Sequence, residues 1–418
     1  MTAQPTDVDV PAAGDTGGIG QAVRDYWARV RGGDIGSLPA VLGLIALIIL
    51  FGALEGATFL SIFNFANLIN QSAAIIVLAM GLVFVLLLGE IDLSAGFAAG
   101  TCAAVLAVAL NTWELAWPLA LLLALLTGGV IGLVIGLLVA RLGIPSFVVT
   151  LAMFLALQGA MLLIIGEGGT IPIRSDAILV VMNGNMPVWA GWLLAVVIVG
   201  GFALTTLLAI LRRRKTGLPA EALSVWAVKV IALGVLIFVA TYLLSQERQL
   251  PTAKVVIQGV PWVVVVILVL LVGLTFILQR TGFGRHVYAV GGNREAARRA
   301  GINVKGLMIT CFIFCSTLAA IAGVLLASRD NSVSPTTGGA QTLLFAVGAA
   351  VIGGTSLFGG RGKIRDAVIG GLVIAVIANG LPLITQQSGI QFVVTGLVLL
   401  VAASVDAISR RRASTTGA

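Results

Sequence analysis

Few residues in this sequence are able to do bond chemistry. His286 is the single histidine, so neither a histidine-based metal site nor a Ser-His-Asp arrangement can be built. The stretch Gly353–Ile364 reads GGTSLFGGRGKI and resembles a phosphate-binding loop in its Gly-Lys pair. Leu357 stands where that motif needs its first glycine, and Ile364 stands where it needs Ser or Thr. We therefore predict no catalytic residues, no metal site, no bound cofactor and no ATPase activity in this chain.

Two carboxylates lie between apolar segments. Glu90 and Asp92 belong to the run GEIDLSAG at 89–96. Acidic side chains near membrane depth are costly and indicate a functional or helix-terminating role. One interpretation is that Glu90, Asp92 and Ser94 line a polar path or brace a broken helix. The other is that Asp92 and Ser94 accept free N–H groups at the start of the next helix while Glu90 faces water; the two are compatible.

A second polar run, GGNREAARRAGI at 291–302, predicts a short helix outside the bilayer. Asn293 is a good N-cap, Glu295 complements the helix start, and Gly301 can end the helix. Its Ala-rich surface suits docking into a groove of a cytoplasmic partner. The alternative is a solvated loop helix.

These polar runs are set in a very apolar chain. Of 418 residues, 59% are hydrophobic and 10% are charged, against roughly 25% charged in a typical soluble domain. Crossing a bilayer takes about 20 apolar residues. Candidate segments run at 39–55, 70–89, 93–111, 116–140, 145–166, 187–211, 225–245, 259–279, 306–328, 341–358, 366–384 and 390–408. The sequence predicts an all-α, polytopic integral membrane helix bundle of about 12 transmembrane segments, in which the short 341–358 segment either spans or is re-entrant.

The basic residues favour one orientation. With the N-terminus inside and every segment spanning, 20 of the 25 Lys and Arg residues lie on the inner side and four on the outer side. This is the positive-inside pattern, so we predict N-in and C-in. The distribution also explains the net charge of +8 without nucleic acid.

The predicted organisation has three parts: a cytoplasmic, largely disordered tail at 1–38, a transmembrane domain at 39–408, and a basic cytoplasmic tail at 409–418. Residues 21–30 suit either an amphipathic helix or a continuation of the tail. Two repeats of small residues predict helix-packing seams, and five tryptophans at outer segment ends predict an interface belt. These residues are Gly128, Gly132 and Gly136, Ala319, Gly323 and Ala327, and Trp113, Trp117, Trp189, Trp192 and Trp262.

Three blocks resemble one known family, the sugar-importer permeases of the ribose and xylose class within ATP-binding cassette transporters. The blocks are 89–96, 291–304 and 351–360, and the runs 284–289 and 379–380 also fit. The resemblance covers 40–185 and 255–410. Two extra apolar segments around 187–245 precede the coupling loop at 280–305, as in the longer, xylose-like members.

The resemblance implies roles for particular residues. Coupling to an ATPase is implied for Gly292, Asn293, Glu295, Ala296, Ala297 and Gly301. The family's Glu-Glu-Ala-Ala-type motif appears here with Arg294 in place of its second acid. A place in the translocation path or at a helix break is implied for Glu90, Asp92, Ser94, Gly353, Gly354, Thr355, Ser356 and Asn379.

The family also implies partners and a substrate. We expect a homodimer of permeases in the bacterial plasma (inner) membrane, with ATP and magnesium bound on separate cytoplasmic ATPase subunits. An extracytoplasmic binding protein would deliver a monosaccharide, a xylose-like pentose. The alternatives are a permease for branched-chain amino acids or nucleosides, and a stand-alone ion-coupled secondary transporter, which would need ion-binding carboxylates within its helices.

Overall fold

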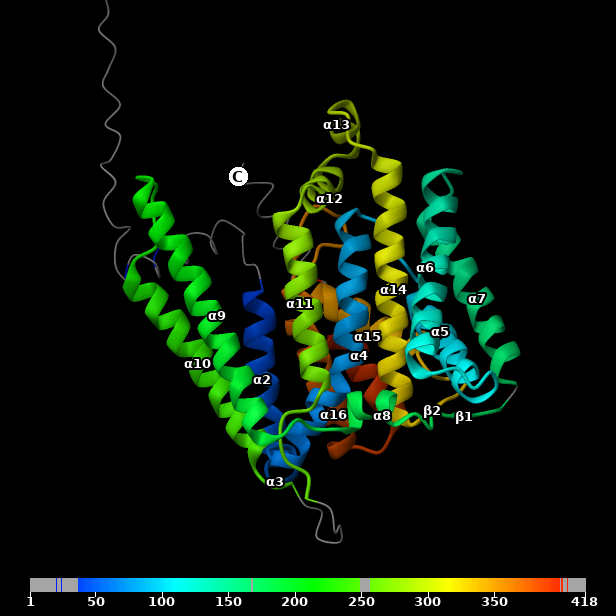
Figure 1. The fold of residues 1–418 in the computed structure, drawn as a ribbon, viewed down its shortest axis with the longest axis horizontal. Coiled ribbons are helices and arrows are strands. Elements are labelled where there is room, and N and C mark those ends of the chain that lie inside the picture. Colours follow the sequence, from blue (N-terminus) through cyan, green and yellow to red (C-terminus); the bar gives the residue numbers. More distant parts are fainter. Residues whose placement is uncertain are drawn as a thin grey trace, which may run out of the picture.

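The structure, a computed structural model, describes residues 37–166, 168–248 and 256–398, with the single residues 20, 24, 400 and 404. It is built almost entirely of helices (Figure 1), which confirms the predicted all-α membrane helix bundle. Two short strands, β1 (Ile171–Pro172) and β2 (Ser332–Val333), pair antiparallel. The helices are α2 (Leu38–Leu54), α3 (Gly56–Phe59), α4 (Ile62–Leu87), α5 (Ala95–Asn111), α6 (Trp117–Ala140), α7 (Ser146–Ile165), α8 (Asp176–Asn183), α9 (Val188–Lys215), α10 (Leu223–Ser245), α11 (Val263–Arg280), α12 (Gly282–Gly292), α13 (Arg294–Arg299), α14 (Val304–Asp330), α15 (Gly339–Gly353), α16 (Ile364–Ile384) and Ser388–Val398.

Every predicted segment coincides with an apolar helix in the described part of the chain. Eight helices are long and apolar enough to cross a membrane. The other four segments coincide with shorter apolar helices, namely α2, α5, α15 and Ser388–Val398. The count of twelve spans therefore stays a prediction. Most of the 390–408 segment, both tails and the 21–30 stretch lie outside the described residues.

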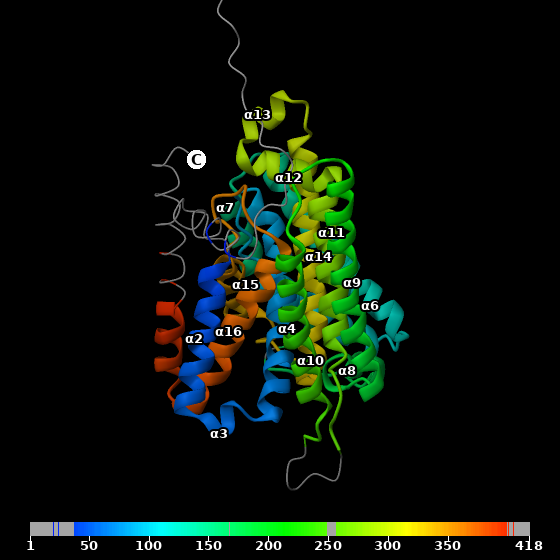
Figure 2. The same cartoon turned by 90° about the vertical axis from the view of Figure 1, so that its left-hand side faces the viewer.

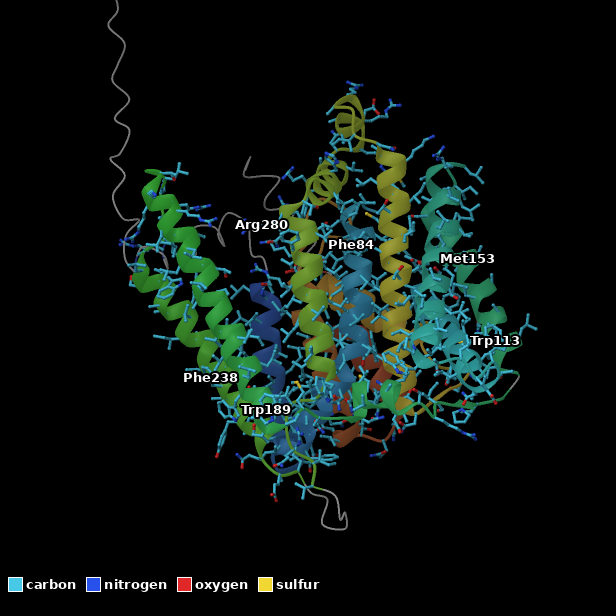
Figure 3. All side chains as sticks on the ribbon, viewed as in Figure 1. Phe84, Trp113, Met153, Trp189, Phe238 and Arg280 are labelled. Atoms are coloured by element: carbon cyan, nitrogen blue, oxygen red, sulfur yellow. The ribbon has the colours of Figure 1, made fainter. Side chains whose placement is uncertain are left out.

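The connecting loops gather at two ends of the bundle. Helices α12 and α13 project from one end, which we call the α13 end. Helices α3 and α8 lie at the opposite end, which we call the outer end after the predicted orientation (Figures 1 and 2). Trp113 and Trp189 lie towards the outer end in Figure 3, as an interface belt requires. Basic clusters end α9 and α13 at the other end: Arg212, Arg213, Arg214 and Lys215 in α9, and Arg298 and Arg299 in α13. This segregation is what a positive-inside arrangement requires, although the orientation itself stays a prediction.

Helices α4 and α14 occupy the centre of the bundle, and most of their apolar side chains are buried. Helix α6 packs on α14 through the predicted glycine seam: a Cβ built on Gly128 would lie 2.6 Å from the Ser316 carbonyl oxygen. On another face of α14, Gly323 packs directly on the backbone of Ala99 in α5. Both predicted seams are confirmed, because only small residues allow backbones this close.

The extra segments around 187–245 form a hairpin of α9 and α10 at one side of the bundle (Figure 1). Within it, Trp226 donates from Nε1 to Thr206 Oγ1 at 3.0 Å. Few of its apolar side chains are buried, as expected for a surface facing lipid. At the outer end the buried Arg248 guanidinium donates to the Gly259 carbonyl at 2.7 Å, which joins the chain just after α10 to the chain just before α11.

Candidate functional site

Two of the short helices begin inside the bundle. Gly96 in the first turn of α5 lies directly against the backbone of Gly339, the first residue of α15. Ala99, one turn further along α5, contacts Gly323 of α14, which is seven residues, or about 10 Å, before α14 ends at Asp330. The non-helical residues before each of these helices therefore enter the bundle.

A polar cavity of about 810 Å³ adjoins the start of α15. Its walls come from α4, α5, α7, the end of α14, the loop 334–338, α15 and α16. Its charged side chains, Arg329 and Asp330, pair with each other at 2.9 Å. The remaining polar side chains are neutral amides and hydroxyls, and two aromatic rings complete the wall: Asn67, Gln71, Gln158, Ser334, Thr336, Thr337, Gln341, Thr342, Phe97 and Phe345. None of the residues predicted for the translocation path lines this cavity.

Asn379 lies directly behind the cavity wall. It is buried, and it exchanges hydrogen bonds with the Asn64 amide at 2.8 and 2.9 Å. Its amide nitrogen also donates to Gln71 Oε1 at 3.2 Å. Since Gln71 lines the cavity, Asn379 positions a wall residue rather than forming the wall.

Asp92 is fully buried just before α5. Its Oδ1 accepts from the Ser94 N–H at 2.9 Å and from the Ser94 hydroxyl at 2.6 Å. Ser94 is the N-cap residue of α5, but its side chain makes no cap bond, because the hydroxyl is turned to Asp92. The expectation that both side chains cap the helix is therefore wrong for Ser94, whereas Asp92 does order the turn that starts α5.

The three sequence blocks that carry the family resemblance converge at the α13 end. The Gly360 N–H donates to the Leu87 carbonyl at 2.9 Å. A Cβ built on Gly291 would lie 1.9 Å from the same oxygen. Gly89 and Gly359 lie beside each other, both with positive φ, at +74° and +87°. We call this meeting of 87–89, 291 and 359–360 the glycine junction.

The block 353–356 forms the turn between α15 and α16 close to this junction. Gly353 packs against the Asp366 backbone, and Gly354 ends α15 with φ +118°. Thr355 and Ser356 are buried in the turn and do not line the polar cavity. The turn is tied to α12 by Tyr288, whose hydroxyl donates to the Gly362 carbonyl at 2.6 Å; burial raises the Tyr288 pKa to about 12, so this donor keeps its proton.

Helix α13 confirms the short helix predicted in the coupling loop. Asn293 is its N-cap and accepts the Ala296 N–H at 2.9 Å. Glu295 pairs with Arg298 at 2.9 Å and with Arg299 at 3.2 Å, and the hydrogen bond from Arg298 lowers the pKa of Glu295. The helix is followed by Gly301 with φ +83°. The preceding helix α12 was not predicted, because its glycine content hides the helical pattern.

The two alanines of α13 differ in exposure. Ala296 is exposed, whereas Ala297 is buried in the main core. The expectation that both face a partner is therefore wrong for Ala297, which anchors the helix instead. Which side of a six-residue helix faces the protein depends on its packing, and its sequence holds too few apolar residues to show this.

Glu90 does not face open water. Its side chain is 12% exposed and pairs with Arg294, whose guanidinium also donates to the Leu88 carbonyl at 3.4 Å. A second cavity, of about 480 Å³, lies beside this pair between α13, the start of α14 and the loop joining α6 and α7. Arg294, which stands where the family motif has an acid, thus joins α13 to the 88–94 loop.

Comparison with known proteins places these features in one family. A protein-family model described as "Branched-chain amino acid transport system / permease component" matches residues 64–177 and 175–403. The xylose transport system permease protein of Escherichia coli (strain K12) is 35% identical over 372 residues, which is 89% of this chain and 92% of that protein. The Haemophilus influenzae xylose permease is 35% identical over 90% of this chain and 98% of its own length. The ribose import permease protein of Bacillus subtilis is 41% identical over 35% of this chain and 46% of its own. No solved structure matches this chain.

Proposed function

The chain belongs to the family of transport-system permeases that contains the xylose and ribose permeases, and we propose that it imports a monosaccharide, a xylose-like pentose, with energy from ATP. Both xylose permeases match nearly the whole chain, whereas the ribose permease matches about a third of it. This difference in coverage favours a pentose of the xylose type. The location that follows is the bacterial plasma membrane, which the chain crosses many times.

The observation that carries the proposal is the polar cavity. Its volume of about 810 Å³ lies in the range of small-molecule sites, roughly 300–1,000 Å³. Amide and hydroxyl groups both donate and accept hydrogen bonds, as do the hydroxyl groups of a sugar. The Phe97 and Phe345 side chains add apolar surface to the wall, on which the C–H groups of a pyranose can pack. The wall therefore suits a neutral, hydroxyl-rich solute.

The charges of the cavity argue against an amino acid. A zwitterionic solute needs a partner for each of its charges, because burying an unpaired charge is expensive; free charged side chains are the strongest such partners, and helix ends can also serve. Arg329 and Asp330 already neutralise each other, and the other lining side chains are uncharged. The family model is described by branched-chain amino acid transport, so a branched-chain amino acid is the second candidate substrate. The reconstitution experiment described below tests both candidates.

We propose the partners from the family and from the two ends of the bundle. A cytoplasmic ATPase subunit binds ATP with magnesium and docks on α13 through its exposed face, including Ala296. An extracytoplasmic binding protein delivers sugar at the outer end, where the cavity lies. A second copy of this chain completes the importer, and the nucleotide belongs to the ATPase subunits.

Reconstitution tests the proposal. The permease is placed in liposomes with its ATPase and its binding protein, and uptake of radiolabelled xylose, ribose and leucine is measured with and without ATP. We expect ATP-dependent uptake of xylose above ribose, and none of leucine. Leucine uptake alone would establish the amino-acid reading, and sugar uptake driven by an ion gradient without ATP would establish a secondary transporter.

A matched pair of variants connects uptake to the cavity. Gln158 in α7 lines the polar cavity, whereas Leu155 in the same helix does not line it and is 63% exposed. Gln158→Leu removes a donor and an acceptor and should raise KM for sugar about tenfold, the effect of losing roughly 1.4 kcal/mol of hydrogen bonding. Leu155→Ala should leave KM unchanged. Equal KM values for the two variants would place the sugar path elsewhere.

A further inference from the structure

Helix α13 is attached to the membrane part by very few groups. Three of the four charged side chains of α13 pair within the helix, because Glu295 binds both Arg298 and Arg299. Ala297 is its single buried residue. Among the ion pairs and side-chain hydrogen bonds of the described residues, those that join α13 to a segment distant in sequence come from Arg294, to Glu90 and to the Leu88 carbonyl.

The Glu90–Arg294 pair differs from an ordinary surface ion pair. The Glu90 side chain is 12% exposed and Arg294 is 48% exposed. By contrast, the Glu221–Lys229 pair, which joins the connection between α9 and α10 to α10, is 38% and 56% exposed. Exposed ion pairs contribute little to stability because water screens the two charges. A mostly buried carboxylate needs its positive partner, because an uncompensated buried charge is strongly destabilising. If Arg294 moves, separating it from Glu90 is therefore costly, so Glu90 moves with it.

The far side of the pair leads to the polar cavity. Glu90 lies in the loop 88–94 that joins α4 to α5. Both helices line the cavity, α4 through Asn67 and Gln71 and α5 through Phe97. The same loop carries the buried Asp92, which orders the start of α5. The cavity of about 480 Å³ beside the pair leaves room for α13 to shift against α6 and α7 without moving them.

We propose that Glu90 and Arg294 are the positioning pair that transmits movement of α13 to α4 and α5, and hence to the walls of the polar cavity. The inference rests on the proposed docking of an ATPase to α13. When the ATPase closes on ATP, α13 shifts, Arg294 carries Glu90 with it, and the 88–94 loop resets α4 against α5. The glycine junction, where Gly291 and Gly360 bring backbone directly against the Leu87 carbonyl, keeps the neighbouring segments in register.

The test measures movement at the cavity and needs no sugar. Gln341 lines the cavity and is exposed, so Gln341→Cys reports access to a membrane-impermeant maleimide, while the native cysteines Cys102, Cys311 and Cys315 are buried. In the complex reconstituted with its ATPase, labelling is timed without nucleotide and with ATP plus vanadate. We expect a nucleotide-dependent change in rate that Glu90→Gln or Arg294→Gln reduces about five- to 150-fold, the range of typical coupling energies.

Controls separate transmission from simple loss of structure. Glu221→Gln breaks the exposed pair and should keep the full labelling change. Both single variants should copurify with the ATPase and hydrolyse ATP, and the reversed pair E90R/R294E should recover the change. Should the reversed pair not assemble, Arg294→Lys, which keeps the positive charge opposite Glu90, supplies the link instead. A full labelling change in both single variants, or no recovery with either form of the restored link, would overturn the inference.

The same assay separates this inference from the proposed function. A parent protein that responds to nucleotide but takes up no sugar would remove the proposed substrate and leave the positioning pair standing. A parent protein that takes up sugar with ATP, with single variants that behave like it, would leave the proposed function standing and remove the pair. A parent protein that does not respond to nucleotide would remove ATPase coupling, and the inference with it.

Discussion

The glycine junction predicts that two adjacent glycines in α12 differ sharply in the cost of an added methyl group. Gly291 and Gly292 are the last two residues of the helix. A Cβ on Gly291 would lie 1.9 Å from the Leu87 carbonyl oxygen and 2.7 Å from Gly360 N. A Cβ on Gly292 meets nothing within 4 Å. Gly291→Ala therefore forces the end of α12 away from the backbone of Leu87 and Gly360. Gly292→Ala is its matched control.

The magnitude follows from two opposing effects. Replacing glycine by alanine in a helix interior gains up to about 1 kcal/mol, and both variants share this gain or a smaller one near the helix end. Overpacking a close contact costs about 1–3 kcal/mol, and Gly291→Ala alone incurs it. The difference between the two variants isolates the steric cost, so Gly291→Ala should be less stable than Gly292→Ala by about 1–3 kcal/mol.

Unfolding by sodium dodecyl sulfate in mixed micelles, followed by tryptophan fluorescence, gives the free energy of unfolding of each purified variant. Stability is the proper readout here, because both glycines belong to the loop proposed to couple to the ATPase and their effects on transport would be ambiguous. Equal stability of the two variants would show that 291 and 87 are not packed as described, and the convergence of the three blocks would lose its support.

Three further predictions concern topology, docking and the buried amides. Reporter fusions at 213 and 410 should both read cytoplasmic; a periplasmic signal at 410 alone would mean that the short α15 is re-entrant. Ala296→Trp should weaken copurification with the ATPase and lower uptake at normal yield, whereas Ala297→Trp should lower the yield of folded protein, because Ala297 is buried. Asn379→Leu removes the donor to the buried Asn64 amide oxygen and should cost about 1–3 kcal/mol in the same unfolding assay, with unchanged stability arguing against the paired geometry.

The sequence predicts those structural features that depend on residues close together along the chain. Apolar length located the helices, since crossing a bilayer needs a long apolar run. Asn293 and Gly301 marked α13 because N-caps and positive-φ glycines act within one turn. The four-residue spacing from Gly128 predicted a close helix contact for the same reason. These features are local or periodic, so a single sequence contains them.

The cavity was missed because its wall is assembled from distant parts. Gln71 and Gln341 are 270 positions apart in sequence, and neither differs from a solvated amide when met alone. One signal was available: Asn67 and Gln71, spaced i and i+4, place two amides on one face of an apolar helix. Glu90 was likewise misjudged because its partner Arg294 is 204 residues away, and no local pattern predicts such a pair.

The short helices connect the coupling site with the cavity in physical terms. Non-helical backbone at membrane depth is tolerated only where protein or water satisfies its polar groups. The chain before α5 is satisfied by protein, through Asp92 and Ser94. The chain before α15, at 334–338, borders the polar cavity instead. Because α5 and α15 pack together at Gly96, the proposed shift of the 88–94 loop would reach the cavity wall through this contact, although Glu90 does not line the cavity.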